Sequence, residues 1–195
     1  MRVDATELAE RAASGDVKAF TSLYDLFYAR IYNYARFRCD DDSIADDLTS
    51  QIFERLLMKI PGYSVEKGIF EAWLFALARN VIIDYHRAQK LRAFLPWETA
   101  YKLPDNGPSL EESTLRKESE AELLAALSRL SERERDFLGL KYAWGLKNNE
   151  IAELTGSREG NVATILHRAI GRLRTLLEND SPTRPCPIRQ EAQHE

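Results

Sequence analysis

The stretch from Ile69 to Arg92, IFEAWLFALARNVIIDYHRAQKLR, constrains the fold more than any other part of the chain. It contains neither proline nor glycine, and its apolar side chains recur at the three- and four-residue spacings that gather on one face of a helix. These side chains are Leu74, Leu77, Ala78, Val81 and Tyr85. The pattern therefore predicts a long helix with one buried face.

The opposite arc of this helix combines basic, amide and aromatic side chains. At about 100° per residue it carries Trp73, Arg79, Asn80, Asp84, His86, Arg87 and Lys90. Arginine and lysine neutralise phosphates, an indole stacks on an unpaired base, and an asparagine amide can bind a base edge. The combination suits single-stranded nucleic acid, although a solvated charged face with a tryptophan packed against a neighbour gives the same pattern.

Helical periodicity extends over most of the remaining chain. An aromatic-rich stripe over residues 17–38 is typical of a core helix, and a second helix runs from Ile44 to Ile60, capped by Ser43 or an adjacent Asp. Helical patterns resume at residue 118, where Ser131 and Glu134 form a capping box. These patterns predict an all-α fold of two small helical domains, a helical bundle over residues 1–92 and a helix-turn-helix domain over residues 118–179.

Two segments lack a sustained helical pattern. Residues 93–117 include FLPWETAYKLPDNGPSLEES, which has three prolines, an Asn-Gly pair and net negative charge, and predict an irregular acidic linker. The acidity suits passage through a basic channel, and it is equally typical of a solvated linker. Residues 180–195, again with three prolines, predict a disordered tail.

The segment NNEIAELTGSREGNVATILHRAIGRLRTLLE has the spacing of a helix-turn-helix. Ala152 is the small residue where the helices touch, Gly156 the turn glycine and Val162 the branched anchor of the second helix. Ser157 is expected to cap that helix, whose first turns would face the major groove. The residues predicted to reach base edges are Arg158, Glu159, Asn161, Thr164 and His167, and those predicted to hold phosphates are Arg168, Arg172 and Arg174.

Composition and spacing argue against several other classes of protein. Apolar runs are far shorter than the ~20 residues of a membrane helix, and the N-terminus lacks the apolar region of a signal peptide, so a cytoplasmic protein is expected. Cys39 and Cys186 are isolated, and neither a zinc site nor a cofactor is expected. The acids Asp40, Asp41, Asp42, Asp46 and Asp47 share one loop and helix start, which favours a docking patch or solvated terminus over a Mg²⁺ site and argues against an enzyme.

The two halves together resemble bacterial RNA polymerase sigma factors of the extracytoplasmic-function (ECF) type, within the sigma-70 family. The stretches that carry the resemblance are ADDLTSQIFERLL, FEAWLFALARNVIIDYHR and LSERERDFLGLKYAWGLKNNEIAELTGSREGNVATILHRAIGRLRTLL. The resemblance implies an alternative sigma factor that binds core RNA polymerase and directs promoter-specific initiation of transcription without catalysing a reaction.

The resemblance also implies a role for each part. The sigma-2-like half would dock on the clamp helices of the polymerase β′ subunit through Asp46, Asp47, Gln51 and Glu54. It would capture the non-template strand of the −10 element through Tyr63, Trp73, Arg79, Asn80, Asp84, Arg87 and Lys90. The sigma-4-like half would read the −35 element as duplex and touch the β flap, the linker would pass through the active-site region and RNA exit channel, and an anti-sigma factor is an expected partner.

Two alternatives compete with this interpretation. A LuxR-like helix-turn-helix activator would suit the second half, but it requires a ligand-binding or receiver half, and residues 1–92 lack the alternating strands of a receiver. A nuclease or recombinase could use the Asp40–Asp47 cluster with Mg²⁺ to cleave DNA.

Overall fold

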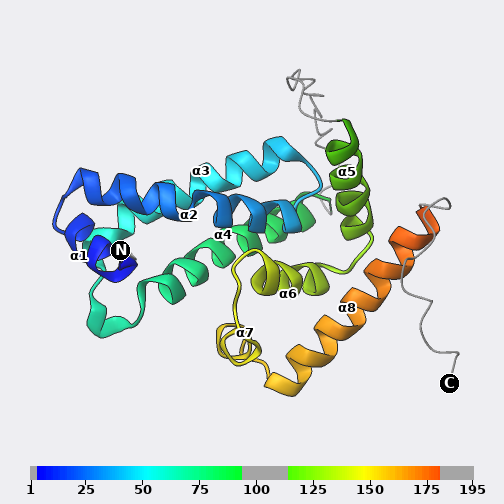
Figure 1. Ribbon diagram of the computed structural model, residues 1–195. Coiled ribbons are helices and arrows are strands. Elements are labelled where there is room, and N and C mark those ends of the chain that lie inside the picture. Colours follow the sequence, from blue (N-terminus) through cyan, green and yellow to red (C-terminus); the bar gives the residue numbers. More distant parts are fainter. Residues whose placement is uncertain (1–3, 94–113, 181–195) are drawn as a thin grey trace, which may run out of the picture.

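The computed structural model describes residues 4–93 and 114–180 (Figure 1). Within these ranges the chain folds into eight α-helices and two 3₁₀ turns, with no strand, which confirms the predicted all-α class. The first half contains α1 (Ala5–Ala13), α2 (Val17–Arg38), α3 (Asp42–Lys59), η1 (Ile60–Gly62), η2 (Val65–Lys67) and α4 (Phe70–Ala93). The second half contains α5 (Thr114–Ser128), α6 (Glu132–Tyr142), α7 (Asn148–Thr155) and α8 (Glu159–Asp180).

Side-chain caps fix where the main helices begin. Asp16 caps α2 by accepting hydrogen bonds from the N–H groups of Lys18 and Ala19 at 2.9 and 3.1 Å. Asp41 caps α3 in the same way. Of the two caps expected from the sequence, Ser43 or an adjacent aspartate, the structure therefore has the aspartate. The predicted capping box of α6 is confirmed, because Ser131 N–H donates to Glu134 Oε2 at 2.9 Å and Glu134 N–H donates to Ser131 Oγ at 3.3 Å.

The first half is a bundle in which α2, α3 and α4 lie alongside one another and α1 covers one end (Figure 1). Phe27 of α2 and Phe70 of α4 meet edge to face at its centre, with ring centroids 5.8 Å apart. The face of α4 predicted to be buried is buried at Leu74, Ala78 and Val81. The 3.6-residue period thus identified the inner face of this helix correctly.

The second half packs α6 and α7 against α8. Ile151 and Ala152 of α7 and Val162 of α8 are buried where the two helices meet. Gly156 ends α7 in the left-handed conformation, with φ of +64°, which glycine adopts without a steric penalty. The predicted helix-turn-helix is therefore present, with its small, turn and anchor residues in the expected places.

The helix boundaries differ from the predicted linker at both of its ends. Residues 94–113 of that segment, and residues 181–195 of the predicted tail, lie outside the described residues. Helix α4 continues to Ala93 and α5 already begins at Thr114, inside the segment predicted to be irregular. The sequence TLRK after the last proline contains no helix breaker, so α5 can extend backwards through it. None of the described helices is long and apolar enough to span a membrane.

The two halves form one continuous buried cluster, because α6 lies directly against α2. In Figure 1, α6 lies beneath α2 and α4, and α8 runs diagonally away from it. Gly139 is the point of closest approach: a Cβ built there would lie 2.7 Å from Cδ2 of Tyr34. A side chain at position 139 would therefore force the two halves apart.

Candidate nucleic-acid interface and the contact between the two halves

The predicted base-reading and phosphate residues of the second half are all exposed. They lie on α8 or directly before it: Arg158, Glu159, Asn161, Thr164, His167, Arg168, Arg172 and Arg174. Ser157 does not cap this helix as predicted. Its N–H donates to the Ala152 carbonyl at 2.9 Å, which keeps Ser157 in the turn that ends α7, and α8 begins only at Glu159.

The three phosphate candidates of α8 differ in their surroundings. Arg172 donates to both carboxylate oxygens of Glu134 in α6, at 3.0 and 2.7 Å, so its charge is already compensated within the second half. Arg168 and Arg174 make no ion pair with any residue in the described part of the chain. A phosphate would therefore meet an uncompensated guanidinium at these two positions and a neutralised one at Arg172.

Four of the predicted strand-capture residues lie on the exposed surface of α4: Asn80, Asp84, Arg87 and Lys90. Asp84 lies within 3.5 Å of Arg55 from α3 and within 3.8 Å of Arg87. The ammonium group of Lys90 donates to Glu132 of α6 at 3.0 Å. The structure thus brings these side chains to one face, and α6 of the other half reaches the edge of that face.

Tyr63 and Trp73, the two aromatic candidates, pack into the first half. Tyr63 is buried, its hydroxyl donates to the Gly68 carbonyl at 3.1 Å, and its ring lies 5.3 Å from Phe70 and 5.5 Å from Trp73 between centroids. Trp73 is partly buried against the same cluster. In this structure both rings pack beside the loop before α4, and Tyr63 is too buried to present an open face for stacking on a base.

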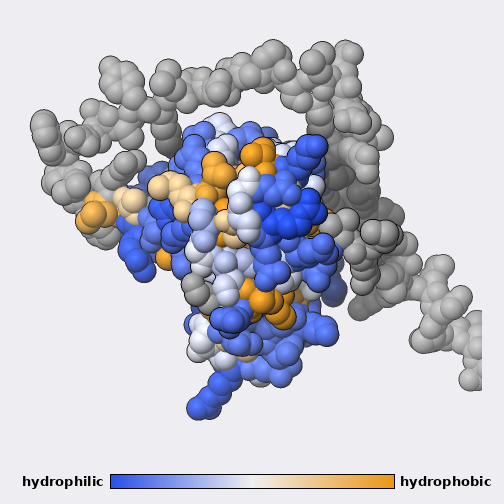
Figure 2. All heavy atoms as spheres, turned by 90° about the vertical axis from the view of Figure 1, so that its left-hand side faces the viewer, coloured by the Kyte–Doolittle hydropathy of each residue, from blue (hydrophilic) through white to orange (hydrophobic). Residues whose placement is uncertain are grey.

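The end of the molecule that carries this loop exposes apolar side chains. Figure 2 shows that face, on which hydrophobic patches lie among hydrophilic side chains. Met58 at the end of α3 and Ile69 before α4 are 80% and 67% exposed, and Val65 between them in the sequence is half exposed. The sequence reasoning did not single out these side chains, because Met58 lies off the buried face of α3 and isolated apolar residues in a loop carry no periodicity.

The predicted polymerase-docking residues share one surface of α3. Asp46, Asp47, Gln51 and Glu54 are all exposed there. Tyrosines of α2 adjoin this surface: Tyr28 lies 6.4 Å from Phe53 between ring centroids, and Tyr24 lies 4.4 Å from it. Burial and then the nearby Asp46 carboxylate raise the pKa of the Tyr28 hydroxyl. Aromatic side chains of α2 therefore border the acidic surface of α3. The sequence reasoning had assigned the aromatic residues of this helix to the core alone.

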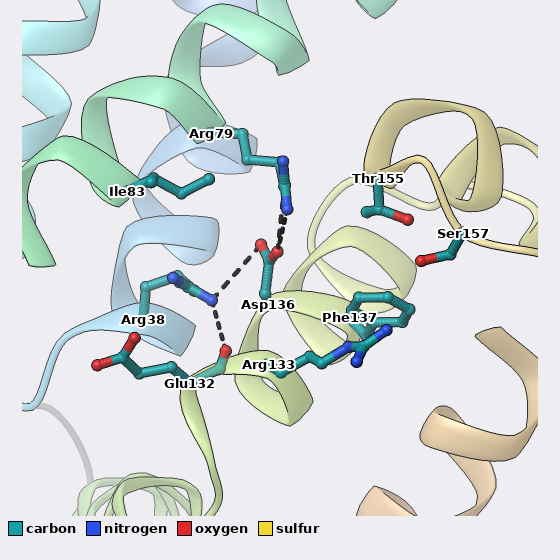
Figure 3. Close-up of a pocket in the computed structure, with 9 residues that line it drawn as sticks. All are labelled: Arg38, Arg79, Ile83, Glu132, Arg133, Asp136, Phe137, Thr155 and Ser157. Atoms are coloured by element: carbon teal, nitrogen blue, oxygen red, sulfur yellow. Dashed lines mark hydrogen bonds and ion pairs between the residues drawn. The ribbon is translucent and has the colours of Figure 1, made fainter. Parts of the chain in front are cut away.

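Arg79, a further strand-capture candidate, is held by an acid of the opposite half. Its Nε and Nη2 atoms donate to one carboxylate oxygen of Asp136 in α6, at 3.0 and 2.9 Å (Figure 3). The other carboxylate oxygen accepts the Tyr34 hydroxyl at 2.6 Å and lies 3.5 Å from Nη1 of Arg38. The Asp136 side chain is only 6% exposed, so one buried carboxylate joins α2, α4 and α6.

The Asp136 cluster, as we call Tyr34, Arg38, Arg79 and Asp136, borders a pocket of about 300 Å³ between the halves (Figure 3). Burial, and next the Asp136 charge, raise the pKa of the Tyr34 hydroxyl well above its usual value, so this hydroxyl remains a donor. Arg38 also donates to the Glu132 carbonyl at 2.6 Å. Sequence reasoning missed Tyr34, Arg38 and Asp136, which are far from one another in the chain.

Two further contacts flank the cluster. On one side, Arg135 of α6 donates to the Phe37 carbonyl at 2.8 Å and pairs with Asp40 at 2.8 Å. On the other, the Trp144 ring packs against Phe75 of α4 with centroids 4.0 Å apart, and Arg30 of α2 donates to the Trp144 carbonyl. The interface thus combines buried ion pairs with a buried aromatic contact.

His86 of α4 lies beside this interface with its Nε2 atom buried and without a hydrogen-bond partner among the described residues. Burial lowers the pKa of His86, and the positive charge of Arg38 lowers it further. The folded chain therefore binds a proton at this imidazole less readily than the unfolded chain does.

We expect the free energy of unfolding to fall as the pH decreases below the ordinary histidine pKa of 6.5, and His86→Gln to weaken this dependence. Because the folded pKa is depressed, the contribution of His86 is fully present above 6.5 and is lost as the pH falls through the lowered pKa. Urea unfolding at a series of pH values measures how the free energy of unfolding depends on pH. The control is His167→Gln on the exposed face of α8. An unaltered pH dependence in His86→Gln would contradict the assignment.

A helix-turn-helix with an exposed second helix, joined to a helical bundle that presents basic and amide side chains, defines a DNA-binding transcription factor. Comparison with known protein families supports this class. The family model of Sigma-70 region 2 matches residues 23–92, and that of Sigma-70, region 4 matches residues 120–173. The ECF RNA polymerase sigma factor ShbA of Streptomyces griseus is 30% identical over 88% of this chain and 94% of its own length. BldN of Streptomyces coelicolor, another ECF sigma factor, is 33% identical over 90% of this chain and 66% of its own length.

A solved structure shows the same fold. RpoE of Bartonella quintana, determined in complex with the anti-sigma factor NepR, aligns with a TM-score of 0.62 at 23% identity, over 84% of this chain and 99% of that one. The chain belongs to the ECF sigma factors of RNA polymerase and acts as an alternative sigma factor in the initiation of transcription. The LuxR-like alternative is not favoured, because the first half matches sigma-70 region 2.

Proposed function

We propose that this sigma factor divides promoter recognition between its two exposed faces. The face of α8 reads the −35 element as duplex, with Arg168 and Arg174 on phosphates. The face of α4 captures one strand of the −10 element after the duplex opens. The observation that carries the proposal is the presence of exposed cationic and amide side chains on both halves.

The surface of α3 formed by Asp46, Asp47, Gln51 and Glu54 is proposed to dock on the β′ clamp helices of core polymerase, and the second half to contact the β flap. Their exposed side chains support this assignment, since a docking surface needs unpartnered polar groups at its rim. The protein would supply recognition while the polymerase supplies the chemistry, so we propose a non-enzymatic role in the cytoplasm.

An anti-sigma factor is proposed as a further partner, because RpoE of Bartonella quintana was determined in complex with the anti-sigma factor NepR. We also propose a division into a first domain over residues 1–92, a linker over 93–117, a second domain over 118–179 and a tail over 180–195, although helices α4, α5 and α8 extend by one to four residues into the linker and the tail. Run-off transcription with purified core polymerase and genomic DNA fragments tests the function. Transcripts that begin at discrete sites only when this chain is added support it, and the absence of any such transcript contradicts it.

We expect Asn80→Ala to reduce open-complex formation by about tenfold while leaving polymerase binding unchanged, because an amide that binds a base edge contributes about 1–3 kcal/mol. Permanganate footprinting of unpaired thymines measures opening, and co-elution with core polymerase measures binding. The matched control is Asn33→Ala on the exposed surface of α2. Loss of polymerase binding in Asn80→Ala would place this residue on the docking surface instead.

A further inference from the structure

The pocket beside the Asp136 cluster is lined by side chains from four separate parts of the chain (Figure 3). Arg38 comes from α2, Arg79 from α4 and Arg133 from α6, while Thr155 and Ser157 come from the end of α7 and the turn after it. Its volume of about 300 Å³ lies at the lower end of the ~300–1,000 Å³ that is typical of small-molecule sites. The pocket is therefore of a size for a small ligand.

The described lining of this pocket carries three guanidiniums and two carboxylates, so its net charge is positive. Both carboxylates already have cationic partners. Asp136 lies 2.9 Å from Arg79 and 3.5 Å from Arg38, and the ammonium group of Lys90, outside the pocket, donates to Glu132 at 3.0 Å. An anion that enters the pocket would therefore meet compensated carboxylates and a surplus of positive charge.

Three of the lining residues have donors without a partner among the described residues. The Arg38 side chain is only 4% exposed, yet its Nε is buried and makes no hydrogen bond. Arg133 is exposed and forms no ion pair in the described part of the chain, and its guanidinium lies 5.6 Å from the centroid of the Phe137 ring. Ser157 uses its N–H in the turn after α7 and leaves its hydroxyl unpaired among these residues. Because a buried donor without an acceptor is costly, a bound anion would compensate this arrangement.

The donors of this pocket match a terminal phosphate group better than other anions. A phosphate monoester has three free oxygens and a charge of about −1.5 to −2 at pH 7, whereas a phosphodiester of a DNA strand has two free oxygens and one charge. Guanidiniums bind such oxygens through parallel hydrogen bonds, and a hydroxyl adds a further donor. Ile83 also lines the pocket and offers an apolar surface to the organic part of a ligand.

We propose that this pocket binds a small phosphate monoester, with its phosphate group held by Arg38, Arg133 and the Ser157 hydroxyl. Arg79 remains paired with Asp136 in this arrangement and contributes positive charge to the wall of the pocket. The site adds a small-molecule ligand to the functions proposed above and does not depend on them.

Three substitutions test the donors while leaving the buried Arg38 and Asp136 in place. Arg133→Gln removes an exposed guanidinium, so the fold should be unaffected. Arg133→Lys keeps the charge but replaces the planar fork of donors by a point charge. Ser157→Ala removes the hydroxyl and keeps the N–H that bonds to the Ala152 carbonyl.

Two control variants change the same kinds of group outside the pocket. Lys18→Gln removes one positive charge from the exposed start of α2, and Ser22→Ala removes one hydroxyl from the exposed surface of the same helix. Neither residue lines the pocket. Circular dichroism verifies that all five variants keep their helix content.

Isothermal titration calorimetry of the full chain measures binding of inorganic phosphate, adenosine monophosphate and adenosine, with chloride holding the ionic strength constant. We expect the two phosphates to bind and adenosine not to bind. Arg133→Gln should weaken both phosphates at least about tenfold and Ser157→Ala at least about threefold, because hydrogen bonds to a charged group are strong. Arg133→Lys should lose less affinity than Arg133→Gln, and both controls should match the wild type.

The proposal is overturned if neither phosphate binds beyond the level of chloride, or if Arg133→Gln and Ser157→Ala bind both phosphates as tightly as the wild type. A single-stranded oligodeoxynucleotide with a 5′-hydroxyl serves as competitor, because it contains phosphodiesters and no monoester. Displacement of adenosine monophosphate by this strand would assign the pocket to the DNA backbone and would also overturn the proposal. These titrations contain no polymerase, so their failure is distinct from a failure of run-off transcription.

Discussion

Trp144→Ala is expected to lower the free energy of unfolding by about 3–5 kcal/mol, the range for removing a large aromatic side chain from a core. Trp144 is 1% exposed and packs against Phe75 and Tyr34 of the first half, with centroids 4.0 and 5.8 Å away. Its indole Nε1 has no hydrogen-bond partner in the described part of the chain, so the loss is one of packing.

Urea denaturation followed by circular dichroism measures this change. Tyr142→Ala is the control, because Tyr142 is an aromatic residue of the same helix end that is 58% exposed, and we expect it to change stability by less than about 0.5 kcal/mol. Equal losses of unfolding free energy in the two variants would contradict the conclusion that Trp144 packs in the contact between the two halves. A second, separate unfolding transition in Trp144→Ala alone would show that the indole also couples their unfolding.

Arg168→Ala is expected to weaken binding to duplex DNA of arbitrary sequence by about eightfold at ~0.1 M salt and to reduce the slope of log affinity against log salt by ~0.9. Each phosphate contact releases roughly one counterion, and Arg168 is an exposed cation of α8 without an ion pair among the described residues. Arg172→Ala should reduce the slope less, because Glu134 already compensates Arg172.

Fluorescence anisotropy titrations of the full chain at several salt concentrations give both slopes. Lys18→Ala is the charge-matched control, since Lys18 is exposed at the start of α2, far along the chain from α8. An unchanged slope for Arg168→Ala would remove this residue from the phosphate contacts. A larger slope change for Arg172→Ala than for Arg168→Ala would show that Glu134 releases its partner to the DNA.

Periodicity predicted the helices and their buried faces because burial repeats with the helical period. The inner face of α4 and the helix-turn-helix residues Ala152, Gly156 and Val162 are confirmed. Local chemistry also predicted the capping box at Ser131 and Glu134, which involves residues three positions apart. The cap predicted at Ser157 was wrong, because α8 begins only at Glu159, two residues further along the chain.

The contact between the halves could not be predicted from the sequence. Tyr34 and Asp136 are 102 positions apart, and a helical period states that a side chain is buried without stating what buries it. A glycine inside a helical pattern, such as Gly139 in α6, indicates from sequence alone only a locally less stable helix. In the structure it is the residue at which the Tyr34 ring of α2 comes closest to α6. The partner of Arg79 could not be predicted for the same reason, because Asp136 lies 57 positions away in the chain.

Helix α4 ends at Ala93 and α5 begins at Thr114, so one continuous chain joins the first half to the second half. Because both halves belong to one chain, the local concentration of one half near the other does not depend on the concentration of the protein in the cell. Even a contact of modest intrinsic affinity would then stay formed most of the time. A partner that separates the halves competes with this constant local concentration, so lengthening the connection between the halves should favour their separation without altering a single contact.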